Sequence, residues 1–173
     1  LTTLADEAQA AIDEIHALAT GLYPAILEAE GLDTAIRTMA TTAPVPITID
    51  GTIERHPPDI ELAAFYCISE AVTNAMKHAQ PPITITLTQT PTTLTFTITD
   101  TGPGFNPDTT PHGSGLLNMH DRLDTIGGTL TITSQPNTHT TIHATIPTTG
   151  DRSHIDTPDN RAVLAQSIGA DRP

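Results

Sequence analysis

Two kinds of hydrophobic periodicity alternate along the middle of the chain and predict its helices and strands. Apolar residues three and four positions apart predict helices over about 59–79 and 115–126, with a shorter helical segment just after Gly31. Elsewhere apolar residues alternate with polar ones, mostly threonine, which predicts strands with one buried face. The apolar positions of these strands are Val45, Ile47 and Ile49; Ile83, Ile85 and Leu87; Leu94, Phe96 and Ile98; Leu130 and Ile132; and Ile142, Ala144 and Ile146.

This order of elements predicts an α+β fold, a two-layer α/β sandwich in which helices cover one face of a mixed sheet. The threonine-rich face of the sheet is expected to meet the solvent. We expect this domain to occupy residues 31–148. After Pro147 the apolar periodicity fades, so residues 149–173 are expected to form a polar, mobile tail.

Residues 1–30 carry a different pattern, which favours pairing with another helix. Six apolar residues are separated by four and three positions in turn, the spacing of a heptad seam. The alternative is a helix that packs on the sheet of its own domain, which would show a broader apolar face. The seam consists of Leu4, Ala8, Ala11, Ile15, Leu18 and Leu22.

The predicted helix over 59–79 carries reactive side chains along one stripe. At about 100° per residue, Glu70, Asn74 and Lys77 fall within an arc of roughly 60°, opposite the apolar residues. The amide oxygen of Asn74 suits Mg²⁺, which prefers hard oxygen ligands, and Glu70 can accept a proton from a nucleophile. The alternative is an ordinary solvated helix face with an ion pair.

Two glycine motifs follow, at residues 100–104 (Asp-Thr-Gly-Pro-Gly) and 113–115 (Gly-Ser-Gly). Asp100 closes a predicted strand at the edge of the sheet, and the glycines after it let the backbone come close to a ligand. The second motif opens a helix, whose N-terminus presents amide groups to anions such as phosphates. Each motif alone is also compatible with a simple turn. The sequence contains neither the dinucleotide-binding fingerprint nor the Gly-Lys-Ser/Thr ending of a P-loop.

Charge and cysteine content narrow the possible partners and locations. A net charge of −13 with only seven Lys and Arg would repel nucleic acids and anionic membrane surfaces. A nucleotide would therefore need neutralisation by a divalent ion and by backbone N–H groups. The single cysteine, Cys67, excludes an internal disulfide and is expected to be a small buried hydrophobe. No apolar run approaches the ~18 residues of a membrane span, which favours a cytoplasmic location, whether or not a longer parent protein is membrane-anchored.

In order and spacing, these motifs resemble the nucleotide-binding boxes of sensor histidine kinases. These kinases form a branch of the ATPase superfamily that also includes DNA gyrase and the ninety-kilodalton heat-shock chaperones. The resemblance spans roughly residues 31–147 and is closest to kinases whose response regulators carry a helix-turn-helix, through residues 23–32 and 115–128. It implies an ATP-dependent protein-histidine kinase with ATP and Mg²⁺ as ligands. It also makes residues 1–30 the last helix of a dimerisation and phosphotransfer hairpin, with its linker.

The resemblance also implies roles for single residues. Glu70 would be the catalytic base, Asn74 the magnesium ligand, and Asp100 the acceptor for the exocyclic amine of adenine. The short polar loop between Phe105 and Gly113 would be a lid over the phosphates. Arg122 would either reach a phosphate or remain an exposed side chain. The implied nucleotide contacts are Asn74, Lys77, His78, Asp100, Gly102, Gly104, Gly113, Ser114, Gly115, Leu116, Arg122 and Thr140.

Four histidine and asparagine positions bear on this resemblance and on the metal alternatives. Asn137 and His139 stand where the family frequently has glycine, and asparagine tolerates the left-handed backbone that such a turn requires. His139 and His143 lie four residues apart on one face of a predicted strand, but they lack a nearby third ligand for zinc. His16 lacks an acidic neighbour, so we expect the phosphoacceptor histidine to lie outside this sequence.

The implied partners are a second copy of the chain, paired through the N-terminal helix, and a response regulator. Neither nucleic acid nor direct membrane contact is expected. One alternative is a related serine kinase that captures sigma factors or their antagonists, which the heptad seam and the Tyr23-Pro24 segment argue against. A second alternative is a non-catalytic nucleotide-binding module that signals through its lid, which the presence of Glu70 and Asn74 argues against.

Overall fold

The computed structural model describes residues 25–78, 82–105 and 114–149. The predicted pairing helix before residue 25 and the predicted tail after residue 149 lie outside the described residues, as does the whole predicted lid between Phe105 and Gly113. Residues 25–30 are helical, and the elements after them are α2 (Leu32–Thr42), β1 (Ile47–Asp50), α3 (Pro58–His78), β2 (Ile83–Gln89), β3 (Thr93–Asp100), α4 (Ser114–Asp124), β4 (Thr129–Gln135) and β5 (His139–Pro147).

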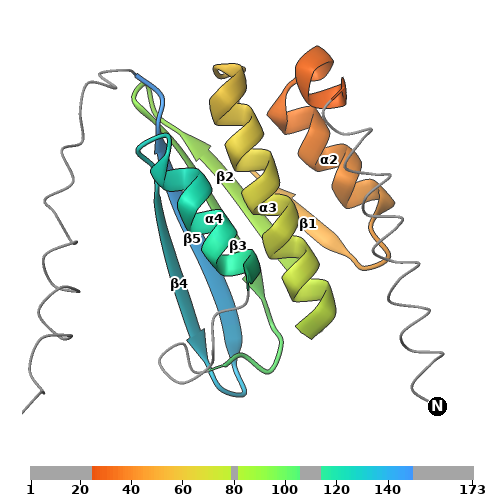
Figure 1. Ribbon diagram of the computed structural model, residues 1–173. Coiled ribbons are helices and arrows are strands. Elements are labelled where there is room, and N and C mark those ends of the chain that lie inside the picture. The colour runs from red at the N-terminus through yellow and green to blue at the C-terminus, as the bar shows by residue number, and fades with distance from the viewer. Residues whose placement is uncertain (1–24, 79–81, 106–113, 150–173) are drawn as a thin grey trace, which may run out of the picture.

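The five strands form one mixed sheet in the order β1-β2-β3-β5-β4. Strands β1 and β2 are parallel, and all other neighbours are antiparallel. Figure 1 shows α2, α3 and α4 side by side on one face of this sheet. The predicted α+β sandwich is therefore confirmed. Within the described residues, no helix is long and apolar enough to cross a membrane.

Helix α3 is the central helix of the layer, and its ends follow the local sequence. Pro58 occupies the first helical position, where a missing N–H costs nothing, and acidic residues in the first turn complement the helix dipole. Lys77 and His78 do the same in the last turn. The predicted apolar side packs on the sheet, as expected from its spacing. Its buried residues include Phe65, Ile68, Ala71, Val72 and Ala75.

The two faces of the sheet differ as the alternation predicts. The inward positions of β2, β3 and β5 are almost all buried and apolar, and they form the core together with the helices. The outward positions are aligned across the strands by the register of the sheet. One row that crosses all five strands consists only of threonines: Thr48, Thr84, Thr99, Thr141 and Thr133.

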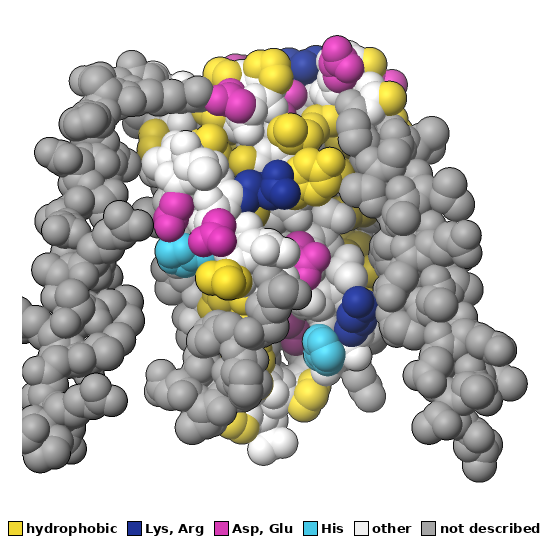
Figure 2. Space-filling view, in the orientation of Figure 1, with side chains coloured by type: hydrophobic (Ala, Val, Ile, Leu, Met, Phe, Trp, Pro, Cys, Tyr) yellow, Lys and Arg dark blue, Asp and Glu magenta, His cyan; other side chains and the backbone are white. Residues whose placement is uncertain are grey.

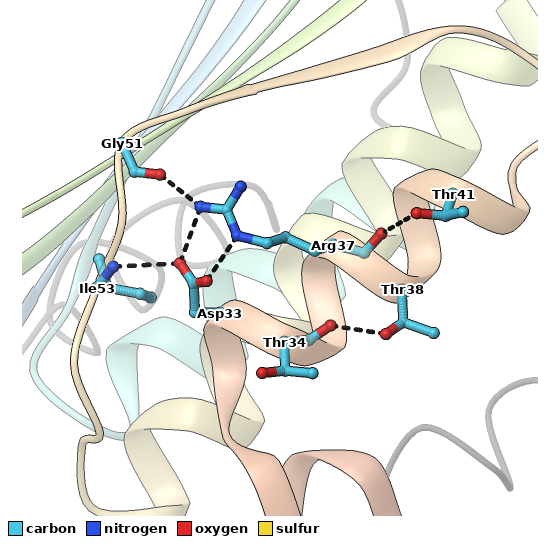
Figure 3. Close-up of polar contacts among 7 residues, drawn as sticks. All are labelled: Asp33, Thr34, Arg37, Thr38, Thr41, Gly51 and Ile53. Carbon is cyan, nitrogen blue, oxygen red and sulfur yellow. Dashed lines mark hydrogen bonds and ion pairs between the residues drawn. The ribbon is translucent and has the colours of Figure 1, made fainter.

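Helix α2 is fastened to the segment after β1 by a polar network around Asp33 (Figure 3). Arg37 Nε donates to Asp33 Oδ2 over 2.6 Å, and an NH2 group of Arg37 donates to the carbonyl of Gly51, also over 2.6 Å. Asp33 Oδ1 accepts from the backbone N–H of Ile53. The hydrogen bond to Asp33 raises the pKa of Arg37 above its usual value. These bonds fix α2 against the chain that leads into α3.

A second cluster joins residues 25–30 to the start of α3. Arg55 Nε lies 3.1 Å from Oε1 of Glu61, a carboxylate in the first turn of α3 that is almost fully buried. The guanidinium of Arg55 also donates to the backbone carbonyl of Glu28. The same Glu61 oxygen accepts from the backbone N–H of His56. Through Arg55, the buried carboxylate of Glu61 thus links residues 25–30 to the start of α3.

Candidate nucleotide-binding site

Glu70 lies on α3 with its carboxylate directly against the first turn of α4. A Cβ placed on Gly115 would collide with Oε1 of Glu70, so only glycine permits this approach without a shift of the carboxylate or the helix. The two helices pack beside each other (Figure 1), and the first turn of α4 lies against the Glu70 carboxylate. The glycine motif and the acidic stripe, which are 45 residues apart in the sequence numbering, thus meet in one place.

The remaining residues of the α3 stripe follow Glu70 along the helix. Asn74 is half-buried one turn later, while Lys77 and His78 are exposed in the last turn. On α4, Leu116 is half-buried and packs against the core, and Ser114 is the first residue of the helix. Gly113 lies outside the described residues. The described residues contain no group of three or more His, Cys, Asp or Glu side chains that could hold a metal ion by themselves.

Asp100 ends β3 and is one of three polar or charged residues that are buried in the described part of the chain. Asp100 closes its strand as predicted, and because β3 is the middle strand of the sheet, it lies at the end of a central strand and not on an edge strand. Its Oδ1 accepts a hydrogen bond of 2.9 Å from the backbone N–H of Gly102. This bond is local and leaves Oδ2 available to an amino group of a ligand.

The loop after Asp100 is held by the β4–β5 hairpin. A Cβ on Gly104, which has a φ of 57°, would collide with the carbonyl oxygen of Gln135. The backbone N–H of Asn137 donates to the carbonyl of Pro103 over 2.5 Å, and Asn137 itself has a φ of 63°. The expectation that asparagine adopts the left-handed conformation in this turn is confirmed. This close contact explains why the motif requires glycine at position 104.

A row of polar side chains crosses three adjacent strands at the end of the sheet where Asp100 lies. Thr140 on β5 is paired directly with Asp100 on one side and with Ser134 of β4 on the other. The Oγ of Ser134 is 2.9 Å from Oγ1 of Thr140 and accepts a 2.8 Å hydrogen bond from the backbone N–H of Phe105. All three side chains stand at inward positions, which are otherwise apolar.

Comparison with known families decides what kind of site this is. Residues 59–150 match the model of the histidine kinase-, DNA gyrase B-, and HSP90-like ATPase family. The chain belongs to this family. The matched segment contains α3, the whole sheet except β1, and α4, so it includes Glu70, Asp100 and both glycine motifs. Membership identifies residues 59–150 as an ATPase domain of the type that sensor histidine kinases carry, and it implies ATP as the ligand.

Two relatives are similar to this chain over more residues than this domain contains. The chain is 29% identical over 147 residues to the oxygen sensor histidine kinase NreB of Staphylococcus carnosus, covering 80% of this chain and 42% of the relative. It is 32% identical over 149 residues to the sensor protein VraS of Staphylococcus saprophyticus, covering 83% of this chain and 43% of the relative. The chain therefore spans less than half the length of each of these relatives.

Solved structures show the same fold at lower sequence identity. The blue-light activated histidine kinase of Erythrobacter litoralis EL346 superposes with a TM-score of 0.58 at 19% identity, covering 68% of this chain and 42% of that one. The histidine kinase AdeS of Acinetobacter baumannii gives a TM-score of 0.55 at 14% identity, covering 82% and 84% of the two chains. These similarities establish the fold of the ATPase domain in this chain.

Arg122 of the ATPase domain contacts an aromatic ring. Its guanidinium carbon lies 4.5 Å from the ring centroid of Tyr66, one turn before Glu70 on α3, and the side chain is exposed. The structure thus gives Arg122 a cation–π contact between α3 and α4.

Figure 2 shows the helix-covered face with acidic side chains scattered among a few basic ones, without a large basic patch.

Cys67 is buried between α3 and α4, which confirms its predicted character. Its thiol donates to the backbone carbonyl of Met119 over 3.7 Å. Burial raises the pKa of Cys67 to about 12, which the charge of Arg122 partly offsets and that of Glu70 reinforces. The thiol is therefore a packing group of the interface that carries Glu70 and Gly115.

Sequence reasoning missed one residue of the polar row, Ser134. A signal was available, because Ser134 continues the inward series of Leu130 and Ile132 in β4. A polar residue at an inward position needs a hydrogen-bond partner. Asp100 and Thr140 interrupt the apolar series of β3 and β5 in the same way. The register that places the three side by side could not be derived from one sequence.

Proposed function

We propose that this chain carries the ATP-binding catalytic domain of a sensor histidine kinase. The domain transfers the γ-phosphoryl group of ATP to a histidine outside this sequence, and the phosphohistidine passes it to an aspartate of a response regulator. The observation that carries the proposal is the close approach of the Glu70 carboxylate to Gly115 at the start of α4. It supports one site in which a proton acceptor lies beside a helix N-terminus suited to phosphate.

Each end of the nucleotide has matching residues in this proposal. The adenine lies at the end of β3, where Oδ2 of Asp100 accepts from its exocyclic amine and Thr140 contacts the adjoining ring edge. The backbone at Gly102 and Gly104 comes close to the base because neither residue has a side chain. The triphosphate extends toward the start of α4, where the amides of the helix N-terminus are available to the phosphate oxygens. Lys77 and His78 add positive charge at the end of α3.

The transfer step needs a proton acceptor and charge neutralisation more than covalent help from the protein. The bond between the β–γ bridging oxygen and the γ-phosphorus breaks, ADP leaves, and a phosphorus–nitrogen bond forms on the acceptor imidazole. Glu70 accepts the proton that the imidazole loses. Because the Glu70 carboxylate extends from α3 to the first turn of α4, its position depends on the packing of these two helices.

The residues around Asn74 fit a bound Mg²⁺ ion. The amide oxygen of Asn74 is a hard ligand, half-buried one turn after Glu70, and Mg²⁺ usually takes one or two protein ligands together with water and phosphate oxygens. Such an ion would supply the local positive charge that a chain with a net charge of −13 otherwise lacks.

We also propose that the whole protein is a cytoplasmic-facing homodimer. The heptad seam of residues 1–30 would form the second helix of a dimerisation hairpin, and the junction held by Arg55 and Glu61 would connect it to the ATPase domain. A response regulator is the proposed final acceptor. The boundaries at residues 30 and 148 belong to this proposal.

Transfer of label from γ-labelled ATP tests the function. The chain is mixed with a separately produced helical hairpin that carries a histidine next to an acidic residue. Acid-labile, alkali-stable label on the hairpin supports the proposal. Acid-stable label on a serine would instead identify a serine kinase, and ATP binding without any transfer would identify a nucleotide-binding module.

A further inference from the structure

Three contacts between α3 and α4 follow one another along both helices. Residues that come later in α3 contact residues that come earlier in α4, because the two helices run antiparallel (Figure 1). The contact pairs are Glu70 with Gly115, Cys67 with Met119, and Tyr66 with Arg122. Together the three pairs define one position of α4 along α3.

This position decides where the start of α4 lies relative to Glu70. The carboxylate lies so close to α4 that a Cβ on Gly115 would be 1.9 Å from its Oε1. A shift of α4 by one helical turn, a rise of about 5.4 Å, would carry the amides of its first turn away from the carboxylate. In the proposed function these amides bind the phosphates, so the register of the two helices sets the distance between phosphate and base.

Tyr66 and Arg122 form the contact that lies farthest from the proposed phosphate site. The ring of Tyr66 makes an edge-to-face contact with the buried ring of Phe65, with 5.9 Å between the centroids. Side chains on a helix lean toward its N-terminus, so Arg122 in the last turn of α4 reaches back along the helix. Its guanidinium thus binds a ring that is itself held against the core.

The other contacts between the helices restrain their register less. The bond from Cys67 to the carbonyl of Met119 is weak, because a thiol is a poor hydrogen-bond donor. Burial of Met119 and Leu123 holds α4 on the domain, but hydrophobic burial is non-directional. Gly115 lets Glu70 approach and has no side chain of its own that could hold the carboxylate. A directed contact at the far end of α4 is therefore the feature that best fixes the register.

We propose that Arg122 is a positioning residue for phosphotransfer, which binds the ring of Tyr66 and so fixes the first turn of α4 beside Glu70. The inference rests on the proposed function, because it requires Glu70 as the base and the start of α4 as the phosphate site. Arg122 acts from the far end of α4 and needs no contact with the nucleotide. Without this contact other registers of α4 become populated, and only a fraction of the molecules holds the phosphates beside the base.

The test is a double-mutant cycle of Arg122→Gln and Tyr66→Leu. The quantity measured is the initial rate of transfer from γ-labelled ATP to the separate hairpin at saturating ATP. Each single variant should be slower than the wild type by roughly two- to fivefold, the range for one exposed cation–π contact. The double variant should be no slower than the slower single variant. Arg122→Lys and Tyr66→Phe, which keep the cation and the ring, should retain most of the rate.

The single cysteine of the chain reports on the same helix contact independently of catalysis. Cys67 is fully buried and bonds to α4, so its alkylation requires α3 and α4 to separate locally. Tyr66→Leu leaves the charges near the thiol unchanged and should raise the alkylation rate by roughly two- to fivefold, whereas Tyr66→Phe should not. Asp121→Asn, exposed beside Arg122 on α4, should change neither alkylation nor transfer.

The possible failures of the inference and of the proposed function are distinguishable. Unchanged transfer in both Arg122→Gln and Tyr66→Leu, or losses that multiply in the double variant, overturn the inference. It is also overturned if Arg122→Gln weakens the binding of ATP but not of AMP while Tyr66→Leu does not, because Arg122 would then bind the phosphates directly. A wild type that transfers no label to the hairpin overturns the proposed function itself.

Discussion

The Glu70 carboxylate rests against the backbone of Gly115, and a methyl group added at position 115 would lie only 1.9 Å from Oε1. This contact brings together a helix and a glycine motif that the sequence separates, and it makes the position of the proposed base depend on a glycine in another helix. The effect of a side chain at position 115 would be steric, through displacement of the Glu70 carboxylate, and not conformational, because Gly115 is not among the glycines with positive φ.

Gly115→Ala is therefore expected to lower both stability and phosphotransfer. In a helix, alanine is normally favoured over glycine by about 0.5–1 kcal/mol, so any destabilisation must come from the collision with Glu70. In a Glu70→Ala background the same substitution should be neutral or stabilising, which urea unfolding of the four variants measures. Asn118→Ala, at an exposed position of α4, is the control. Equal effects in both backgrounds would show that the contact has no energetic role.

Asp100→Asn should weaken the binding of adenine nucleotides by roughly 10- to 150-fold. Asp100 is buried, and the loss of a hydrogen bond to a charged group costs about 1.5–3 kcal/mol. Titration calorimetry with ATP and ADP gives the affinities. Asp121→Asn, an exposed carboxylate on α4, should leave them unchanged. An Asp100→Asn variant with wild-type ATP affinity would rule out the assigned position of the base.

The hydrogen bonds around Asp33 should contribute measurably to the free energy of unfolding but not to the binding of ATP. Asp33→Ala removes the acceptor for the N–H of Ile53 and the partner of Arg37, which should cost about 1–2 kcal/mol because the carboxylate is only partly exposed. Thr41→Ala removes only an exposed hydroxyl from the same helix and should cost much less. Urea unfolding midpoints compare the two. If both variants lose the same stability, the Asp33 network is not a fastening point of α2.

The buried thiol of Cys67 should make the free energy of unfolding fall at high pH. The folded-state pKa is raised to about 12 from an ordinary value of 9.0, so the buried neutral thiol contributes fully below pH 9, and this contribution is lost as the pH rises toward 12. The unfolding free energy of the wild type should therefore fall more between pH 8 and about 10.5 than that of Cys67→Ala. Parallel curves for the two proteins would contradict this. The native thiol should also resist alkylation at pH 8.

The sequence predicted the elements of this fold better than the way in which they meet. Alternation with threonine identified all five strands of the described residues, because one face of the sheet packs under helices and the other remains polar. The stripe of Glu70 and Asn74 on α3 followed from helical spacing alone. Long-range placement did not follow, since the position of β3 in the middle of the sheet depends on strand order, which periodicity does not encode.

The same contrast between predictable local features and unpredicted long-range contacts holds for single residues of the site. Both glycine motifs were recognised, yet the reason for glycine at positions 104 and 115 lies in distant partners, the carbonyl of Gln135 and the carboxylate of Glu70. Asn137 was predicted correctly because left-handed backbone is a local property of asparagine. Ser134 was missed because its partners, Phe105 and Thr140, lie 29 and 6 residues away in the sequence.

The central claim is that this domain transfers phosphate with Glu70 as the base, to an acceptor that is not part of this chain. We therefore expect the wild type to bind and slowly hydrolyse ATP without labelling itself on histidine. Glu70→Ala should keep its ATP affinity within a few-fold of the wild type while losing most of its transfer to a separate hairpin.

The most direct measurement is the initial rate at which acid-labile label moves from γ-labelled ATP to the separate hairpin, for the wild type and Glu70→Ala at saturating ATP. We predict a rate at least about a hundredfold lower for Glu70→Ala, the lower end of the usual contribution of a general base, with no label on the chain itself. Equal rates for the two proteins would contradict the role of Glu70. Label on the wild-type chain that disappears in His16→Ala would contradict the location of the acceptor.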